Sequence, residues 1–168
     1  MYGTGKWFLP KNGKPGRWMP PIQDLQPCES GYHTIRETGL AYWIGARLFT
    51  LEAKGRRIPK DEHVLVVEQA RLLKEILTWN EQTQRLFACD CAETVKPQTK
   101  ISQATIHIAR RFAFGLETKQ ALEAAYWAAY WAAYWAADRA AYKTAQNNRL
   151  LQYIRGEVDL EAIKRSVQ

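Results

Sequence analysis

The chain has 168 residues, of which 46% are hydrophobic and 24% are charged, close to the averages for soluble globular domains. Its seven Trp and eight Tyr exclude intrinsic disorder for most of the chain, because disordered segments are poor in aromatic residues. Most of the net charge of +7 comes from residues 1–60, which hold ten basic and four acidic residues. This asymmetry favours an anionic partner: a nucleotide, a nucleic acid or an acidic protein surface.

The first 30 residues are rich in Pro and Gly and predict an irregular segment, with a turn at residues 11–16. Trp7, Phe8 and Trp18 favour packing of this segment onto the rest of the protein. Residues 3–6 (Gly-Thr-Gly-Lys) are similar to a fragment of a phosphate-binding loop but lack its spacing and its preceding strand. The chain shows neither the apolar core of a signal peptide nor an apolar run that could span a bilayer. We therefore expect a cytoplasmic protein that does not enter a membrane.

Three segments with β-branched, aromatic or alternating residues predict strands, at residues 31–35, 47–54 and 63–68. A short helix is predicted at residues 40–45, where Gly45 would close it. Gly55 and Pro59 predict a turn that ends the second strand. Residues 70–77 fit either one face of a helix or a further strand.

From residue 78 onwards the spacing of apolar residues predicts helices. They are expected at residues 78–94, 99–114, 118–147 and 159–167, and residues 150–155 continue or restart the third one. Thr78 and Glu81 predict a capping box at the start of the first helix. The predicted class is therefore α+β. A basic, β-containing N-terminal part (1–77) would pack on a C-terminal helical bundle (78–168).

The segment from Ala124 to Ala137 repeats the tetrapeptide Ala-Ala-Tyr-Trp three times and carries no charge. On a helix, one half of the surface would be aromatic and the other half almost pure alanine. Such a helix is a core element, an interface for self-association or a protein partner, or a pocket that stacks a base. The candidate binding residues here are Tyr126, Trp127, Tyr130, Trp131, Tyr134 and Trp135.

No strong catalytic or metal-binding motif is present. The histidines, His33, His63 and His107, match no metal-ligand spacing. The cysteines, Cys28, Cys89 and Cys91, are odd in number and show no pairing pattern, which favours a reducing compartment. Cys89 and Cys91 would point about 200° apart on a helix and could not share a metal ion. We expect no cofactor and no metal.

His33 is the candidate catalytic residue. The sequence from Gly31 to Thr34 is similar to the first strand of ADP-ribosyltransferase-like folds, in which a His after an aromatic residue holds the ribose of a nicotinamide nucleotide. This activity would also need a catalytic Glu, for which Glu68, Glu75 and Glu81 are candidates. The alternative is a histidine that is hydrogen-bonded within the sheet.

Two groups of basic residues are candidate phosphate contacts. Lys54, Arg56, Arg57 and Lys60 are predicted to form a basic turn between strands, within which Arg56 and Arg57 are the candidate binding residues. Arg110 and Arg111 form a second pair on a predicted helix. The alternative for the first group is an exposed turn that only interacts with solvent.

Residues 78–155 resemble a family of helical immunity proteins of bacteria and phages. The residues that carry this resemblance are 78–81, 86–93 and 109–115, together with the Ala-rich helix. The N-terminal part resembles an uncharacterised domain of phage and bacterial proteins. The resemblance implies neutralisation of a toxin by binding, although the Tyr-Trp repeat departs from the family pattern.

These observations favour a non-enzymatic binding protein of phage or mobile-element type that neutralises or sequesters a partner. Its partner would be another protein or a second copy of the chain, bound through the aromatic helix. One alternative is a nucleotide-binding or nucleic-acid-binding module that uses the basic N-terminal part and aromatic rings. The other is an ADP-ribosyltransferase-like enzyme.

Overall fold

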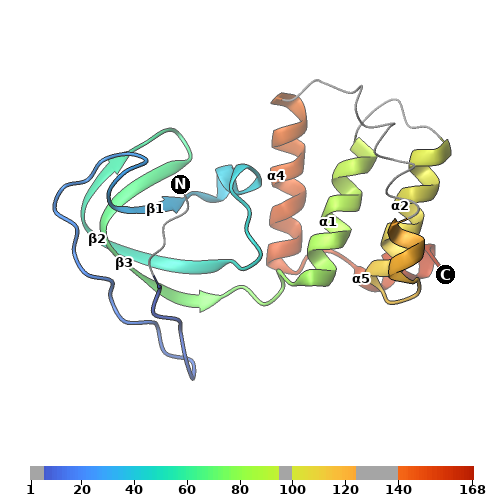
Figure 1. Cartoon of the computed structure of the whole chain (residues 1–168), viewed down its shortest axis with the longest axis horizontal. Coiled ribbons are helices and arrows are strands. Elements are labelled where there is room, and N and C mark those ends of the chain that lie inside the picture. Colours follow the sequence, from blue (N-terminus) through green and yellow to red (C-terminus); the bar gives the residue numbers. More distant parts are fainter. Residues whose placement is uncertain (1–5, 95–99, 124–139) are drawn as a thin grey trace. The chain divides into compact units, whose positions relative to one another are not determined.

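The computed structural model describes residues 6–94, 100–123 and 140–168. The chain divides into two compact units, Met1–Leu77 and Thr78–Gln168, here called the sheet unit and the helical unit. The sheet lies in the N-terminal half and helices occupy the C-terminal half (Figure 1), so the α+β prediction is confirmed. In the described part of the chain, no helix is both long and apolar enough to cross a membrane.

The sheet unit contains three antiparallel strands: β1 (Tyr32–Ile35), β2 (Phe49–Pro59) and β3 (Val64–Glu75). Their order is β1-β3-β2, so the longest strand is central. The ambiguous segment after residue 68 is thus largely strand rather than helix. A 3-10 helix, η1 (Glu37–Tyr42), follows β1 and begins earlier than the short helix predicted there.

The predicted turn at Gly55 is wrong, because β2 continues through it. Lys54 pairs with Gln69 and Arg57 pairs with Val67, so β2 advances three residues while β3 advances two. The extra residue forms a β-bulge, and Gly55 adopts the φ of +78° that a bulge of this kind requires. The chain reverses after Pro59 instead, where the carboxylate of Asp61 accepts hydrogen bonds from two backbone amides.

The segment before β1 begins with the predicted turn, which is confirmed. Lys11 and Lys14 exchange two backbone hydrogen bonds of 3.0 Å. Between them Asn12 and Gly13 have φ values of 53° and 72°, as expected for a tight hairpin turn with both central residues in the left-handed region. This turn leads the chain back towards the sheet (Figure 1).

Residues 16–22 then run along the edge of β3 that faces away from β2. The amides of Gly16, Met19 and Ile22 donate to the carbonyls of β3 residues 72, 70 and 68, at 2.8, 2.9 and 2.9 Å. Met19 and Leu25 are buried, which confirms that this segment packs onto the sheet. The core of the sheet unit is completed by apolar β3 side chains: Val64, Val66, Val67, Ala70 and Leu72.

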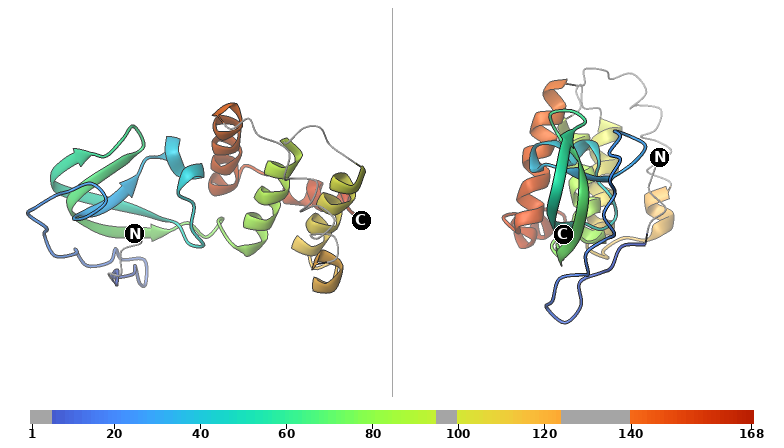
Figure 2. Two further views of the ribbon diagram at one scale, coloured as in Figure 1. Left: turned by 45° about the horizontal axis from the view of Figure 1, so that its top comes forward. Right: turned by 90° about the vertical axis from the view of Figure 1, so that its left-hand side faces the viewer.

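The helical unit contains α1 (Glu81–Thr94), α2 (Lys100–Ala113), α4 (Ala140–Arg155) and α5 (Leu160–Ser166). Figure 2 shows α1 between α2 and α4, and it contacts both of them. The core of the helical unit includes the buried side chains of Trp79, Leu86, Ile106, Leu150 and Tyr153. Gly115 and Gly156, at φ values of 69° and 72°, end α2 and α4 in the left-handed conformation typical of helix C-termini.

The capping box of α1 lies two residues later than predicted. Asn80 accepts a hydrogen bond from the amide of Thr83 at 3.2 Å, and the Thr83 hydroxyl accepts one from the amide of Asn80 at 2.9 Å. Thr78 instead donates its hydroxyl proton to the carbonyl of Ile154 on α4. The Asn side chain therefore caps the helix, and Thr78 ties its entry to α4.

The Ala-Ala-Tyr-Trp repeat, with its six candidate binding residues from Tyr126 to Trp135, lies outside the described residues. The last part of the helix predicted at residues 118–147 falls within α4. This helix begins at Ala140 and continues beyond the predicted end to Arg155. Whether the six rings form a core, an interface or a ligand site stays a prediction.

The close packing around Gly31 predicts that a side chain at this position lowers the stability of the protein. A Cβ at Gly31 would lie 2.4 Å from a Val66 methyl group, whereas a Cβ at Gly13 would meet nothing within 4 Å, and both glycines have a positive φ. Gly31→Ala and Gly13→Ala should each lose about 1–2 kcal/mol from backbone strain. Gly31→Ala should lose about 1–3 kcal/mol more from overpacking. Urea unfolding followed by circular dichroism measures both, and equal losses would contradict the packing described here.

Candidate functional site

One face of the sheet carries several charged and polar side chains near an aromatic ring, among them two of the candidate basic residues, Lys54 and Arg57. Directly paired residues of neighbouring strands lie on the same face of a sheet. The pairs Glu52–Arg71, Lys54–Gln69 and Arg57–Val67 therefore place their members on one face, on which Val67 is the buried apolar member. The name "polar face" is used below for Trp18, Glu52, Lys54, Arg57, Gln69 and Arg71.

Trp18 reaches this face from the segment that precedes β1. Its neighbours are fixed, because Met19 is bonded to β3 through its amide and also accepts a 2.6 Å hydrogen bond from the Gln69 side chain. The Trp18 ring centroid lies 4.3 Å from Nζ of Lys54 and 4.7 Å from Cζ of Arg71. Both distances suit a cation–π interaction, so two strands supply a cation each to one ring.

The polar face has an excess of positive charge. Arg71 forms an ion pair of 2.6 Å with Glu52. In contrast, within the described residues no carboxylate lies at ion-pair distance from Lys54 or Arg57. Arg57 donates to the carbonyl of Ala53 at 2.6 Å, which holds the guanidinium group but leaves its charge uncompensated. Three cations therefore face one carboxylate on an exposed surface.

Arg56, predicted as the companion of Arg57, does not belong to the polar face. Its amide donates to the carboxylate of Glu68 at 2.9 Å, and its guanidinium group donates to the carbonyl of Gln23 at 2.6 Å. Glu68 alternates with Gln69 along β3 and so lies on the opposite face. The bulge at Gly55 thus sends two consecutive arginines to opposite sides of the sheet.

His33 is exposed and forms hydrogen bonds with the loop next to it. Its Nε2 accepts from the amide of Cys28 at 2.9 Å, and its Nδ1 lies 3.3 Å from the carbonyl of Gly31. These two contacts tie the ring to the turn before β1. The ring's partners thus lie in the loop before β1 and not within the sheet, where the alternative interpretation placed them.

The three candidate glutamates do not join His33 in the contacts of the described residues. Glu68 binds the amide of Arg56, and Glu75 forms a two-pronged ion pair with Arg47 at 2.6 and 2.7 Å. Glu81 belongs to the helical unit, where it pairs with Arg85. The described contacts therefore do not assemble the constellation of an ADP-ribosyltransferase-like site.

The helical unit holds a network of charges that the sequence did not predict. Asp90 of α1 accepts from Arg110 of α2 and from Arg149 of α4, at 2.6 Å each, and from the hydroxyl of Tyr153 at 2.8 Å. Arg110 also binds both carboxylate oxygens of Glu93. Arg110, a predicted phosphate contact, is therefore neutralised within the protein. Asp90 and Glu93 lie 20 and 17 residues before Arg110 in the sequence, on a different helix, so no local pattern indicates these pairs.

Burial changes the proton affinity of groups in and next to this network. Burial raises the pKa of Tyr153 and its hydrogen bond to Asp90 raises it further, so its hydroxyl remains a donor. Burial also raises the pKa of the Cys89 thiol to about 11, an effect that the nearby Arg110 reduces only in part. Cys89 is thus a structural thiol rather than a nucleophile.

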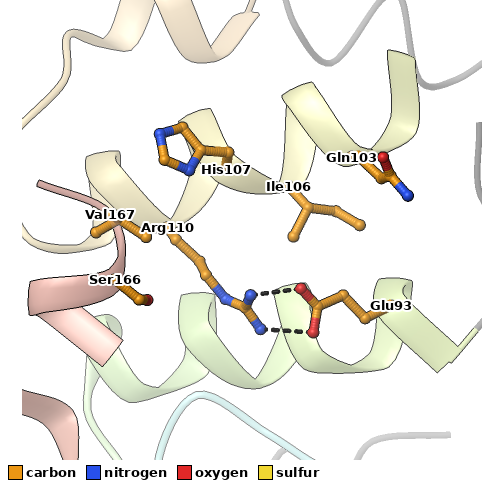
Figure 3. A pocket seen from close by; sticks show the side chains of 7 residues that line it. All are labelled: Glu93, Gln103, Ile106, His107, Arg110, Ser166 and Val167. Atoms are coloured by element: carbon orange, nitrogen blue, oxygen red, sulfur yellow. Dashed lines mark hydrogen bonds and ion pairs between the residues drawn. The ribbon is translucent and has the colours of Figure 1, made fainter. Parts of the chain in front are cut away.

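A hollow of about 200 Å³ lies beside the network. It is lined by Glu93, Gln103, Ile106, His107, Arg110, Ser166 and Val167. Figure 3 shows Arg110 reaching across from α2 to the carboxylate of Glu93 on α1. The hollow is smaller than the roughly 300–1,000 Å³ of typical ligand sites, and the charges of its Arg and Glu cancel each other. The polar face of the sheet unit is therefore the stronger candidate.

The structure brings together no metal site among the described residues, because no group of three His, Cys, Asp or Glu side chains could hold an ion. His63 stacks against Tyr42, with ring centroids 5.2 Å apart, and His107 lies at the hollow. Cys28 is exposed, whereas Cys89 is buried.

Comparisons of the chain with protein-family models, with curated proteins and with solved structures found no match.

The charge network predicts a large effect of Asp90→Asn on stability. The Asp90 side chain is only 10% exposed, and its neutralisation leaves the half-buried Arg149 without a counter-charge and Arg110 with Glu93 alone. We expect a loss of about 1–3 kcal/mol in the free energy of unfolding, measured by urea denaturation. Glu81→Gln, which removes an exposed pair on the same helix, is the matched control and should stay near wild type. Similar values for both variants would show that the network is not structural.

The pKa of Cys89 predicts its reactivity. At about pH 8 a thiol with a pKa of about 11 is almost entirely protonated, and the thiolate is the reactive form. In a titration with Ellman's reagent, the exposed Cys28 should react in the native protein and Cys89 only after unfolding in urea. A Cys28→Ser variant assigns the fast phase. Rapid reaction of all thiols in the native state would contradict the burial of Cys89.

Proposed function

We propose that the protein is a non-enzymatic binding protein that sequesters an anionic macromolecule on the polar face of its sheet unit. The observation that carries this proposal is the pair of uncompensated cations, Lys54 and Arg57, on an exposed face beside the Trp18 ring. Exposed charges of one sign attract a partner of the opposite sign and accelerate its association.

The division of charge between the two units supports the choice of this face. In the helical unit the charges of Arg110 and Arg149 are compensated by ion pairs with Asp90 and Glu93. On the polar face the corresponding counter-charges are missing for two of three cations. A cation that is already paired with a carboxylate gains little from a new anion, whereas Lys54 and Arg57 give up no ion pair among the described residues when an anion binds.

The resemblance of residues 78–155 to helical immunity proteins is consistent with a role in binding, because such proteins act by occupying a partner. An enzymatic function has less support, since His33 is engaged by Cys28 and Gly31 and meets no candidate glutamate in the described contacts. The protein would therefore act by sequestration, as an immunity or counter-defence protein does.

The electrostatic basis of the proposal is tested with heparin as a polyanion. Lys54→Gln combined with Arg57→Gln should lower the affinity of the full chain for labelled heparin. It should also reduce the slope of log affinity against log salt by about one for each lost cation. Anisotropy titrations at several NaCl concentrations measure both quantities.

The matched control is Lys164→Gln combined with Arg165→Gln, which removes two cations from α5 in the helical unit. Its affinity should change much less at the same overall charge. If wild-type protein does not bind heparin, or if the two double variants lose affinity equally, the polar face is not the binding surface.

A further inference from the structure

We infer that the anionic partner of the polar face is single-stranded nucleic acid, with Trp18 stacking on a base and the neighbouring cations contacting phosphates. This inference rests on the proposed function and adds the class of partner. It starts from the juxtaposition of one ring with cations from two strands, at 4.3 Å for Lys54 and 4.7 Å for Arg71.

The ring is held in place before any partner binds. The chain on both sides of Trp18 is bonded to β3, through the amides of Gly16 and Met19. Gln69, on the polar face, adds a third bond to the carbonyl of Met19. A ring positioned by backbone pairing loses little conformational freedom on binding, which favours its use as a stacking platform.

The combination of ring and cation selects among anionic partners. A single strand presents unstacked bases next to its phosphates, so it can use an aromatic ring and a cation at the same time. A duplex keeps its bases stacked inside and offers only phosphates to such a face. An acidic protein surface offers carboxylates without flat rings. The polar face therefore fits a single strand better than the other two.

The same combination recurs elsewhere in the sheet unit. Arg17 lies 4.2 Å from the ring centroid of Phe8, and Lys60 lies 4.6 Å from that of Trp43. These rings are 36% and 52% exposed, and among the described residues neither cation has a carboxylate at ion-pair distance. Proteins that bind single strands contact several successive nucleotides, and repeated ring–cation pairs supply such contacts.

The test compares labelled oligothymidine of about 20 nucleotides with its duplex and with poly-glutamate, using the full chain. Anisotropy at several NaCl concentrations should show tighter binding of the single strand than of the duplex or the polypeptide. Trp18→Leu, which keeps an apolar side chain but removes the ring, should weaken single-strand binding about tenfold. Trp18→Phe should retain most of the affinity because it keeps a ring.

Leu9→Ala is the control, because Leu9 is 49% exposed and apolar but carries no ring. It should bind the single strand as wild type does. Circular dichroism of each variant verifies the fold. If Trp18→Leu proves unstable, the single-strand affinity of Trp18→Phe becomes the deciding measurement.

The outcomes separate this inference from the proposed function. Equal affinity for single strand and duplex, or wild-type binding by Trp18→Leu, overturns the inference while the heparin result still supports a polyanion-binding face. Preference for poly-glutamate points to an acidic protein instead and also overturns it. Failure to bind any of these polyanions, heparin included, overturns both.

Discussion

Backbone pairing along both edges of β3 is the constraint on which the sheet unit depends. On one edge β3 bonds to β2 over most of its length. On the other edge it bonds first to β1, through Val64–Val67, and then to the segment 16–22. An unpaired edge would leave a row of buried amides and carbonyls without partners, at a cost of about 1–3 kcal/mol each. The irregular N-terminal segment is therefore part of the sheet, and this pairing delivers Trp18 to the polar face.

The cations of the helical charge network and those of the polar face differ in how far they are compensated, and desolvation explains the difference. Arg110 is only 18% exposed, so its charge persists there only because Asp90 and Glu93 compensate it. Lys54 and Arg57 remain in water, where an uncompensated charge has little cost. A buried network fixes which residues of neighbouring helices meet, but it leaves no charge for a partner. A face of solvated cations contributes little to stability and keeps its charge available for binding.

Local chemistry made some elements predictable, and contacts between distant residues decided the others. The turn at Lys11–Lys14 and the stop at Gly115 were predicted because Asn-Gly and a terminal Gly determine backbone geometry by themselves. Gly55 was recognised as a break in the strand, but only pairing with β3 turns that break into a bulge. The sequence pattern of the second half of β3 fits a helix as well as a strand, and only hydrogen bonding along both of its edges makes it a strand. Likewise, neither the opposite directions of Arg56 and Arg57 nor the pairing of Arg110 with Asp90 is encoded in local sequence.

The groups that could select a partner and the residues that build the helical core belong to different units. The uncompensated cations and their rings belong to the sheet unit. Leu86, Leu150 and Tyr153 of the helical unit are fully buried, so they serve packing and do not select a partner. A partner is selected by exposed groups, and in the described sheet unit those groups are cations beside rings. The chemistry of a partner is therefore indicated by the exposed groups of the sheet unit rather than by the helical core.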